Sequence, residues 1–236
     1  MSAPQLYGRA SPDFADKLAE TEALLQRAGR EFQPLTQASS LGAEDMVITH
    51  LLHATGTPAS VFVLETGKLH TQPLALIGQI EARYGLQPEL YRPHPGAGEA
   101  FEATHGADAM YQSIELRKAC CGIRKMEPLA RALAGKKAWL TGLRREQSQA
   151  RAEVAFIEAD GPGRQKINPL ARWTTGDVWH FIGREAIPYN ALHDQFFPSI
   201  GCAPCTRAVT LGEDFRSGRW WWESSDLKEC GLHVKK

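Results

Sequence analysis

The feature that most limits the fold is a repeated unit, in which a short apolar run ends in a small polar loop and a helical pattern follows. The run from Val61 to Leu64 contains no polar residue, as expected for a parallel strand that is buried on both faces. The loop 65–67 ends this run, and residues 71–84 then follow helical periodicity up to Gly85, a typical helix-ending residue. Several such units in one chain predict an α/β fold with a doubly wound, mostly parallel sheet.

The remaining elements extend the same pattern. A helix is expected to begin with Ser11 as its N-cap and Pro12 in its first turn, and to run to about Phe32. Other strands are expected over 35–39, 89–92, 138–141, 154–157 and 165–167, the last two as a hairpin, and other helices over 46–52, 98–118, 125–134 and 174–185. A length of 236 residues then predicts a single domain over 1–236, with an irregular C-terminal segment over 206–236.

The loop Ser39-Ser40-Leu41-Gly42-Ala43-Glu44-Asp45 joins the first expected strand to the next helix. In this geometry, free backbone N–H groups and the positive end of the helix dipole face the loop, which suits a phosphate group. The loop has no GK[ST] sequence, so it is not a Walker A loop, and an ordinary strand–helix turn is the alternative. Because ligands of open α/β sheets bind at the carboxyl ends of the strands, this loop and 65–67 are expected to share a site.

The overall charge argues against nucleic acid or a membrane surface as partner, since 27 basic and 27 acidic residues give a formal net charge of zero. No apolar stretch approaches the roughly 18–20 residues that span a bilayer, and the N-terminus lacks the pattern of a secretory signal. We therefore expect an intracellular, reducing compartment, where paired cysteines more often bind metals or do redox chemistry than form disulfides. Basic residues cluster near 117–125, 144–151 and 216–219, which indicates anion sites or, alternatively, solvated surfaces.

Four of the five cysteines form a CC…CxxC set made of Cys120, Cys121, Cys202 and Cys205. Side chains of adjacent residues diverge, so two neighbours fit poorly on one tetrahedral zinc ion. An iron–sulfur cluster offers several separate irons, which favours a [4Fe–4S] cluster over the two alternatives, zinc and unmetallated core cysteines. Cys230 is left alone in a short polar tail beside Gly231.

Several of these motifs together resemble one enzyme family. The loop 39–45, the run Leu64-Glu65-Thr66-Gly67, the CC…CxxC set and the tail Glu229-Cys230-Gly231-Leu232-His233 are similar to the iron–sulfur branch of the phosphoadenylyl-sulfate (PAPS) and adenylyl-sulfate (APS) reductase family. The resemblance covers about residues 35–233. Leu41 stands where the family often has Phe, and Glu65 where it often has Asp. Both departures are expected to adjust how the pocket binds the nucleotide.

The resemblance implies an adenine nucleotide alpha-hydrolase-like (PP-loop) fold and a cytoplasmic enzyme of sulfate assimilation. The implied reaction is thioredoxin-dependent reduction of APS to sulfite and AMP, with Cys230 as the nucleophile that forms an S-sulfonate intermediate. A PAPS or dual APS/PAPS reductase is the alternative, and an iron–sulfur nucleotide-binding sensor or an ATP-dependent tRNA thiolase is a remote one. A thiolase is expected to keep an SGGxDS-type loop, which 39–42 lacks.

The resemblance also implies a cofactor, partners and site residues. A [4Fe–4S] cluster is expected on the four paired cysteines, with APS and thioredoxin as partners in a homo-oligomer. Ser39, Ser40 and Gly42 are expected to contact phosphate, while Leu64 and Thr66 lie along adenine. The other expected substrate-binding residues are Lys125, Arg144 or Arg145, Arg216, Arg219 and His233, with a surface ion pair as the alternative for each cation and an ordinary tail position as the alternative for His233.

Overall fold

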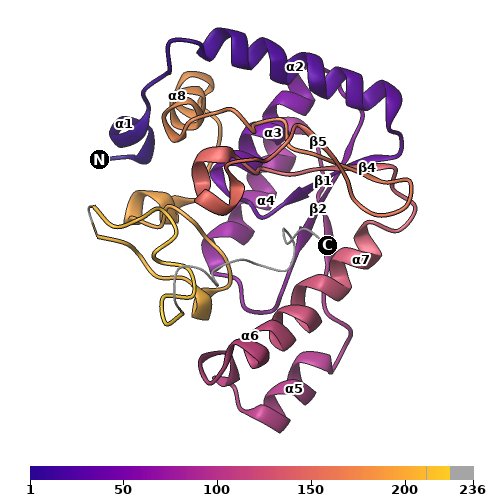
Figure 1. The fold of residues 1–236 in the computed structure, drawn as a ribbon, viewed down its shortest axis with the longest axis vertical. Helices are drawn as coiled ribbons and strands as arrows, with labels where there is room; N and C mark the ends of the chain where they lie inside the picture. The colour runs from indigo at the N-terminus through magenta and orange to yellow at the C-terminus, as the bar shows by residue number, and fades with distance from the viewer. Residues whose placement is uncertain (211, 224–236) are drawn as a thin grey trace.

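The protein is built around a twisted, six-stranded sheet, as a computed structural model that describes residues 1–210 and 212–223 shows (Figure 1). The strand order is β3-β2-β1-β4-β6-β5. All neighbouring pairs are parallel except β5 and β6, which are antiparallel. The strands are β1 (Leu35–Ser39), β2 (Ser60–Leu64), β3 (Glu89–Tyr91), β4 (Ala138–Leu140), β5 (Ile157–Ala159) and β6 (Gln165–Ile167).

The helices of the described residues alternate with these strands along the chain. The α-helices are α1 (Ala3–Tyr7), α2 (Phe14–Glu31), α3 (Ala43–Ala54), α4 (Thr71–Tyr84), α5 (Ala97–His105), α6 (Ile114–Cys121), α7 (Glu127–Ala132) and α8 (Thr175–Glu185). A π-helical turn, η2 (Gly122–Met126), joins α6 to α7. Short 3₁₀ helices are η1 (Ala109–Tyr111), η3 (Arg145–Gln147), η4 (Gln149–Arg151), η5 (Ala191–Gln195) and η6 (Ala203–Cys205).

The central strands bury side chains on both faces, which makes the sheet doubly wound as the sequence predicted. On β4, Ala138 and Leu140 pack into the main core with residues of α2, α3, α4 and α8. Trp139, which points the other way, packs with Leu129 of α7 and Phe62 of β2 in a second cluster. Figure 1 shows α5, α6 and α7 stacked away from α2.

Three sequence-based boundaries were wrong. Helix α2 begins at Phe14 with Asp13 as its N-cap, because the hydroxyl of Ser11 accepts instead from Nζ of Lys17, 2.9 Å away. Strand β5 begins at residue 157 rather than 154, because Val154 is buried in a small separate cluster. The expected helix 98–118 is broken at Gly106, whose φ of +90° ends α5.

None of the helices in the described part of the chain is long and apolar enough to cross a membrane.

Candidate functional site

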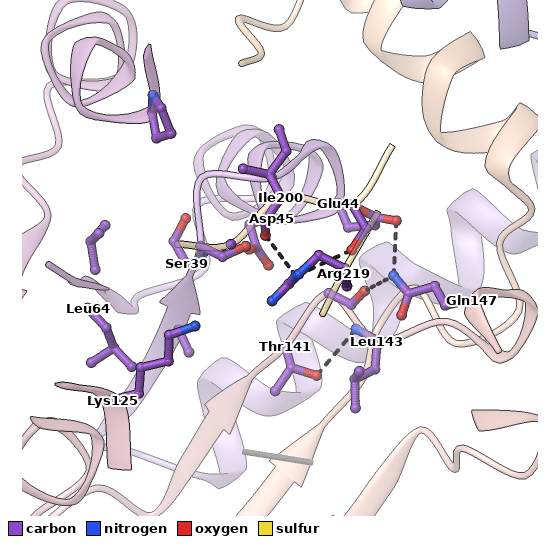
Figure 2. Close-up of a pocket in the computed structure, with 18 of the residues that line it drawn as sticks. Ser39, Glu44, Asp45, Leu64, Lys125, Thr141, Leu143, Gln147, Ile200 and Arg219 are labelled. Carbon is purple, nitrogen blue, oxygen red and sulfur yellow. Dashed lines mark hydrogen bonds between the residues drawn. The ribbon is translucent and has the colours of Figure 1, made fainter. Parts of the chain in front are cut away.

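A cavity of about 210 Å³ opens at the carboxyl ends of β1, β2 and β4, where the sequence placed the ligand. Both predicted loops reach it, one after β1 and one after β2. The expected substrate-binding residues that line it are Ser39, Ser40, Gly42, Leu64, Thr66, Lys125, Arg216 and Arg219. In Figure 2, Lys125 and Arg219 approach this cavity from elements other than those that carry Ser39 and Asp45.

The loop after β1 is held closed by a carboxylate at the start of α3. Oδ2 of Asp45 accepts hydrogen bonds from the backbone N–H and the hydroxyl of Ser40, at 2.7 and 2.6 Å. Leu41 lies between them with φ of +60° and no exposed surface, so its side chain anchors the loop in the core. Gly42 then acts as N-cap of α3. The hydroxyl of Ser40 thus shapes the loop, and both Ser40 and Gly42 line the cavity.

Two adjacent carboxylates make one side of the cavity acidic. Burial raises the pKa of Asp45 to about 6, although its hydrogen bonds with Ser40 favour the charged form. Burial also raises the pKa of Glu44, but the Arg144 guanidinium and the hydrogen bond from Gln147 outweigh this effect and lower it overall. Gly142, at the end of β4, packs so closely that an added Cβ would stand 2.7 Å from Oδ1 of Asp45. Glycine is therefore required at that position.

Neither Arg144 nor Arg145 lines the cavity, so the prediction that one of them binds the phosphosulfate has no support in the structure. The guanidinium of Arg144 is 1% exposed and ion-paired with Glu44, at 2.9 Å, and Glu146, at 3.0 Å. It also donates to the carbonyl of Trp173, so its donors are used in joining the β4 loop to α3 and α8. Arg145 donates from Nε to the carbonyl of Val154, at 2.9 Å.

Three residues that were not expected to bind substrate also line the cavity, together with Glu44 and Asp45 of the loop 39–45: Gln147, Arg151 and His193. Arg151 belongs to the same basic cluster as Arg144, and this cluster was the available signal. His193, on η5, is 4% exposed, and burial lowers its pKa, so the imidazole is neutral near pH 7. No pattern in the sequence pointed to it.

The C-terminal part of the described chain supplies two of the cations. The Arg219 guanidinium lies 4.7 Å from the ring of Trp220 and donates to the carbonyl of Ile200, at 3.1 Å. An added Cβ at Gly201 would lie 2.4 Å from Nη2 of this guanidinium, so a side chain at position 201 would displace Arg219 from its present position. The guanidinium of Arg216 lies 5.9 Å from the ring of Trp220 as well. The indole thus holds both cations in place.

The four paired cysteines meet at a second cavity beside the first. Cys120 and Cys121 end α6, whereas Cys202 is the N-cap of the short helix η6 and Cys205 is its last residue. All four line the same small cavity. Lys125 lines both cavities, four residues beyond Cys121, and so connects the cysteine cavity to the cavity at the sheet edge.

The surroundings of this cysteine set fit a negatively charged iron–sulfur group. Four cationic side chains line the cavity with the cysteines: Lys68, Arg117, Arg124 and Lys125. Trp220 lines it too, and its buried Nε1–H has no acceptor among the described residues, which suits a sulfur acceptor. Burial, with a contribution from Cys202, raises the pKa of the Cys205 thiol to about 11. No group of three or more His, Cys, Asp or Glu side chains among the described residues surrounds a single metal position.

The expected nucleophile Cys230 and its neighbour His233 lie outside the described residues. The last described residue before them is Glu223, which is buried.

A cavity at the carboxyl edge of a mostly parallel sheet is where open α/β proteins bind their ligands, so the fold and the cavity together define an α/β protein of this ligand-binding class. The chain belongs to the phosphoadenosine phosphosulfate reductase domain family, whose model matches residues 34–208.

Sequence similarity to individual proteins supports this family assignment. The chain is 53% identical to adenosine 5'-phosphosulfate reductase of Allochromatium vinosum, over 90% of this chain and 84% of the relative. It is 50% identical to the enzyme of the same name from Burkholderia cepacia, over 95% and 90% of the two chains.

Solved structures show the same fold. The phosphate complex of phosphoadenylyl-sulfate reductase from Candida auris matches with a TM-score of 0.68 and 29% identity, over 85% of this chain and 98% of that one. An FMN adenylyltransferase from Candida glabrata, at 15% identity and a TM-score of 0.57 over 97% and 81% of the chains, shares the fold alone.

Proposed function

We propose that this protein is a cytoplasmic reductase of sulfate assimilation that converts adenylyl sulfate and a reduced thioredoxin to sulfite, AMP and a disulfide. The observation that carries the proposal is the arrangement around Lys125, which lines both the phosphate-cradle cavity and the cysteine cavity. A multiply charged anhydride of sulfate and AMP suits such a site, since the cradle suits its phosphate and the cations suit its sulfate. The names of the two relatives above support APS as substrate.

The proposed chemistry needs one thiol that is not part of the cysteine set, and Cys230 is the remaining cysteine in the chain. The Cys230 thiolate attacks the sulfur atom of APS, the sulfur–oxygen bond to AMP breaks, and AMP leaves with that electron pair. A thioredoxin thiolate then attacks the Cys230 sulfur and releases sulfite. The second thioredoxin thiol closes the disulfide, so the dithiol supplies both electrons.

A [4Fe–4S] cluster, held by Cys120, Cys121, Cys202 and Cys205, completes the proposal, and when bound it supplies a fixed charge beside the sulfate. Because both electrons of the reaction come from the dithiol, no step requires electron transfer through this group. We further propose that the protein acts as a single domain in a homo-oligomer.

Measuring the intact mass after anaerobic incubation with APS, or with PAPS, and no reductant tests this function directly. We expect a sulfonate adduct on Cys230 with APS alone, and none on the Cys230→Ser variant. An adduct with both substrates would instead indicate a dual-specificity enzyme, the candidate that the likeness to the Candida auris PAPS reductase favours. Absence of any adduct on wild-type protein that contains iron would overturn the proposal and favour a nucleotide-binding sensor.

Replacing Lys125 with Ala is expected to slow S-sulfonate formation by roughly 10²-fold, the usual effect of removing one donor that stabilises transition-state charge. The dissociation constant of AMP should change by less than about threefold, because AMP lacks the sulfate that we place beside Lys125. Quenched-flow mass measurements and AMP titrations give the two quantities. Lys118→Ala is the control, since this exposed lysine is on the same helical region and lines neither cavity. Equal losses in rate and in AMP affinity would show that Lys125 only binds nucleotide.

A further inference from the structure

A buried ion pair fixes the chain at the point where the thiol-bearing tail begins. Glu223 is the last described residue before 224–236, and its carboxylate accepts two hydrogen bonds from one guanidinium, that of Arg117. The distances are 2.7 Å from Nε and 2.8 Å from Nη2. The side chains of Arg117 and Glu223 are 1% and 2% exposed, so this bidentate pair is fully enclosed by protein.

The partner in this pair belongs to the cysteine cavity. Arg117 lies on α6, one turn before Cys120, and lines the cavity together with all four paired cysteines. Its guanidinium also lies 4.7 Å from the ring of Trp220, the same indole that Arg219 packs against from the substrate cavity. One side chain therefore contacts the root of the tail, the cysteine cavity and the ring that holds a cation of the anion site.

Stability alone does not account for this arrangement. Removing two charges from water is costly, and apolar residues of similar volume often stabilise a protein as well as a buried ion pair does. A bidentate pair does provide direction, because the planar guanidinium accepts the carboxylate in one orientation only. The geometry thus suits a role in positioning.

The short stretch of chain between Glu223 and Cys230 makes the position of Glu223 important for the reaction. Cys230 follows Glu223 by seven residues, which span at most about 24 Å when fully extended. The place where Glu223 is held therefore limits the region that the Cys230 sulfur can reach. A thiol tethered near its target reacts as if it were highly concentrated, and small errors in the anchor reduce that advantage.

We infer that the Arg117–Glu223 ion pair has a positioning role. It fixes Glu223, the residue that precedes the tail 224–236, at the cysteine cavity, and so directs Cys230 to the bound substrate. This inference rests on the proposed function, in which Cys230 attacks APS. It adds that two residues of the cysteine cavity, Arg117 and Lys125, affect the rate of S-sulfonate formation. Neither Arg117 nor Glu223 touches the substrate in this proposal.

The test uses full-length, iron-loaded protein with Glu223→Gln, which keeps the shape and removes the charge. We expect the rate of S-sulfonate formation at saturating APS to fall by roughly tenfold, because misplacement by about 1 Å can cost up to 10²-fold. The AMP dissociation constant and the iron content should stay within about twofold of wild type, because the substrate cavity and the four cysteines are intact. Glu223→Asp, which restores the charge, should recover part of the rate.

A matched control is available in the same region of the chain. Glu213 forms an ion pair with Arg207, at 2.7 Å, on the surface and lines neither cavity. Glu213→Gln should form the S-sulfonate at the wild-type rate. Arg117→Lys is a second test variant, since it keeps a cation at the cavity but cannot form the bidentate pair, and we expect a smaller loss in the same direction.

The outcomes separate the inference from the proposed function. A wild-type rate in Glu223→Gln, or a parallel loss of rate, AMP affinity and iron in all three variants of the pair, would overturn the positioning role. Wild-type protein that forms no adduct on Cys230 would instead overturn the proposed function itself.

Discussion

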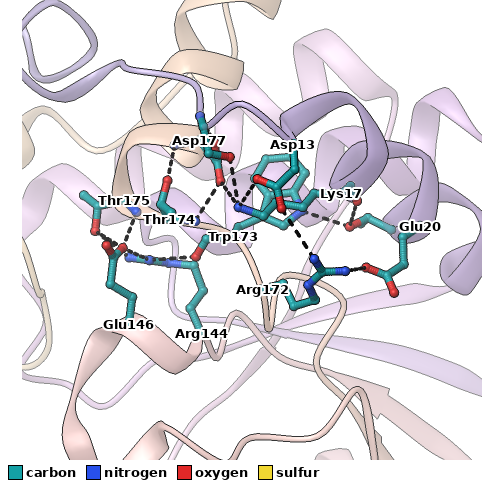
Figure 3. A network of polar contacts seen from close by, with 12 residues as sticks. Asp13, Lys17, Glu20, Arg144, Glu146, Arg172, Trp173, Thr174, Thr175 and Asp177 are labelled. Carbon is teal, nitrogen blue, oxygen red and sulfur yellow. Dashed lines mark hydrogen bonds and ion pairs between the residues drawn. The ribbon is translucent and has the colours of Figure 1, made fainter.

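Asp177→Asn is expected to lower the free energy of unfolding by about 3 kcal/mol, at the lower end of the range for breaking a buried ion pair. Asp177 is completely buried and pairs with the buried Lys17, whose Nζ lies 3.1 Å from Oδ2 (Figure 3). Its carboxylate also accepts the backbone N–H groups of Ser11 and Thr174, at 2.7 and 2.9 Å. In the variant, Lys17 keeps its ion pair with Asp13, so we expect a loss of stability at the lower end of the range.

The same carboxylate makes stability depend on pH. Burial alone would raise the pKa of Asp177, but the hydrogen bonds from Ser11, Thr174 and Lys17 outweigh it and lower the pKa from 3.8 to about 2. A lowered pKa in the folded state stabilises the protein above the unfolded-state value, and this contribution is lost as pH falls from 3.8 towards 2. The shift corresponds to about 2 kcal/mol. The difference between wild type and Asp177→Asn should therefore narrow as the solution is acidified through this window.

Urea unfolding at about pH 5 and about pH 3 measures both effects, since the stabilisation depends on the ionised carboxylate. The control is Glu20→Gln, which removes a partner of Arg172 in the same network (Figure 3). Both of those side chains are well exposed, at 44% and 40%, so the expected loss is under about 1 kcal/mol. Equal destabilisation by the two substitutions would contradict the argument, because burial would then make no difference.

The sequence predicted the central strands and the cavity because their signals are local. An unbroken apolar run identifies β2, and the loop that follows β1 is recognisable from its small polar residues. Parallel strands bring their carboxyl ends to one edge of the sheet, so the strand pattern alone predicted that Ser39 and Thr66 would line the same cavity. Lys125 was also predictable, since four residues on a helical path separate it from Cys121.

Contacts between residues far apart in the sequence determine the parts of the site that could not be predicted. Arg144 and Arg151 stand in one basic cluster, but Arg144 is drawn inward by Glu44, which is 100 residues away along the chain. Only Arg151 then lines the cavity. The adjacent tryptophans also differ in burial. Trp220 is 1% exposed, and its ring lies 4.7 Å from the guanidinium groups of both Arg117 and Arg219, whereas Trp221 is 39% exposed.

Cys205→Ser is expected to reduce the iron content of the purified protein by at least about tenfold. Even changes to groups that only contact metal ligands cost about 10–100-fold in metal affinity, and a missing thiolate should cost more. Cys205 is 8% exposed and shares its cavity with the three other cysteines, so no solvent-exposed position is available for a substitute ligand. Serine keeps the size of the side chain, so the loss would report on the ligand rather than on packing.

Cys230→Ser is the matched control, because this cysteine is not part of the set and the variant should retain wild-type iron. The measurements are iron and acid-labile sulfide per chain, with visible absorbance, on protein purified without oxygen. Cys205→Ser should also reduce S-sulfonate formation, because Lys125 lines the same cavity and would lose the charge of the cluster that we propose beside it. Full iron in Cys205→Ser would exclude this cysteine as a ligand. Loss of iron in both variants would place Cys230 among the ligands and remove it as the free nucleophile.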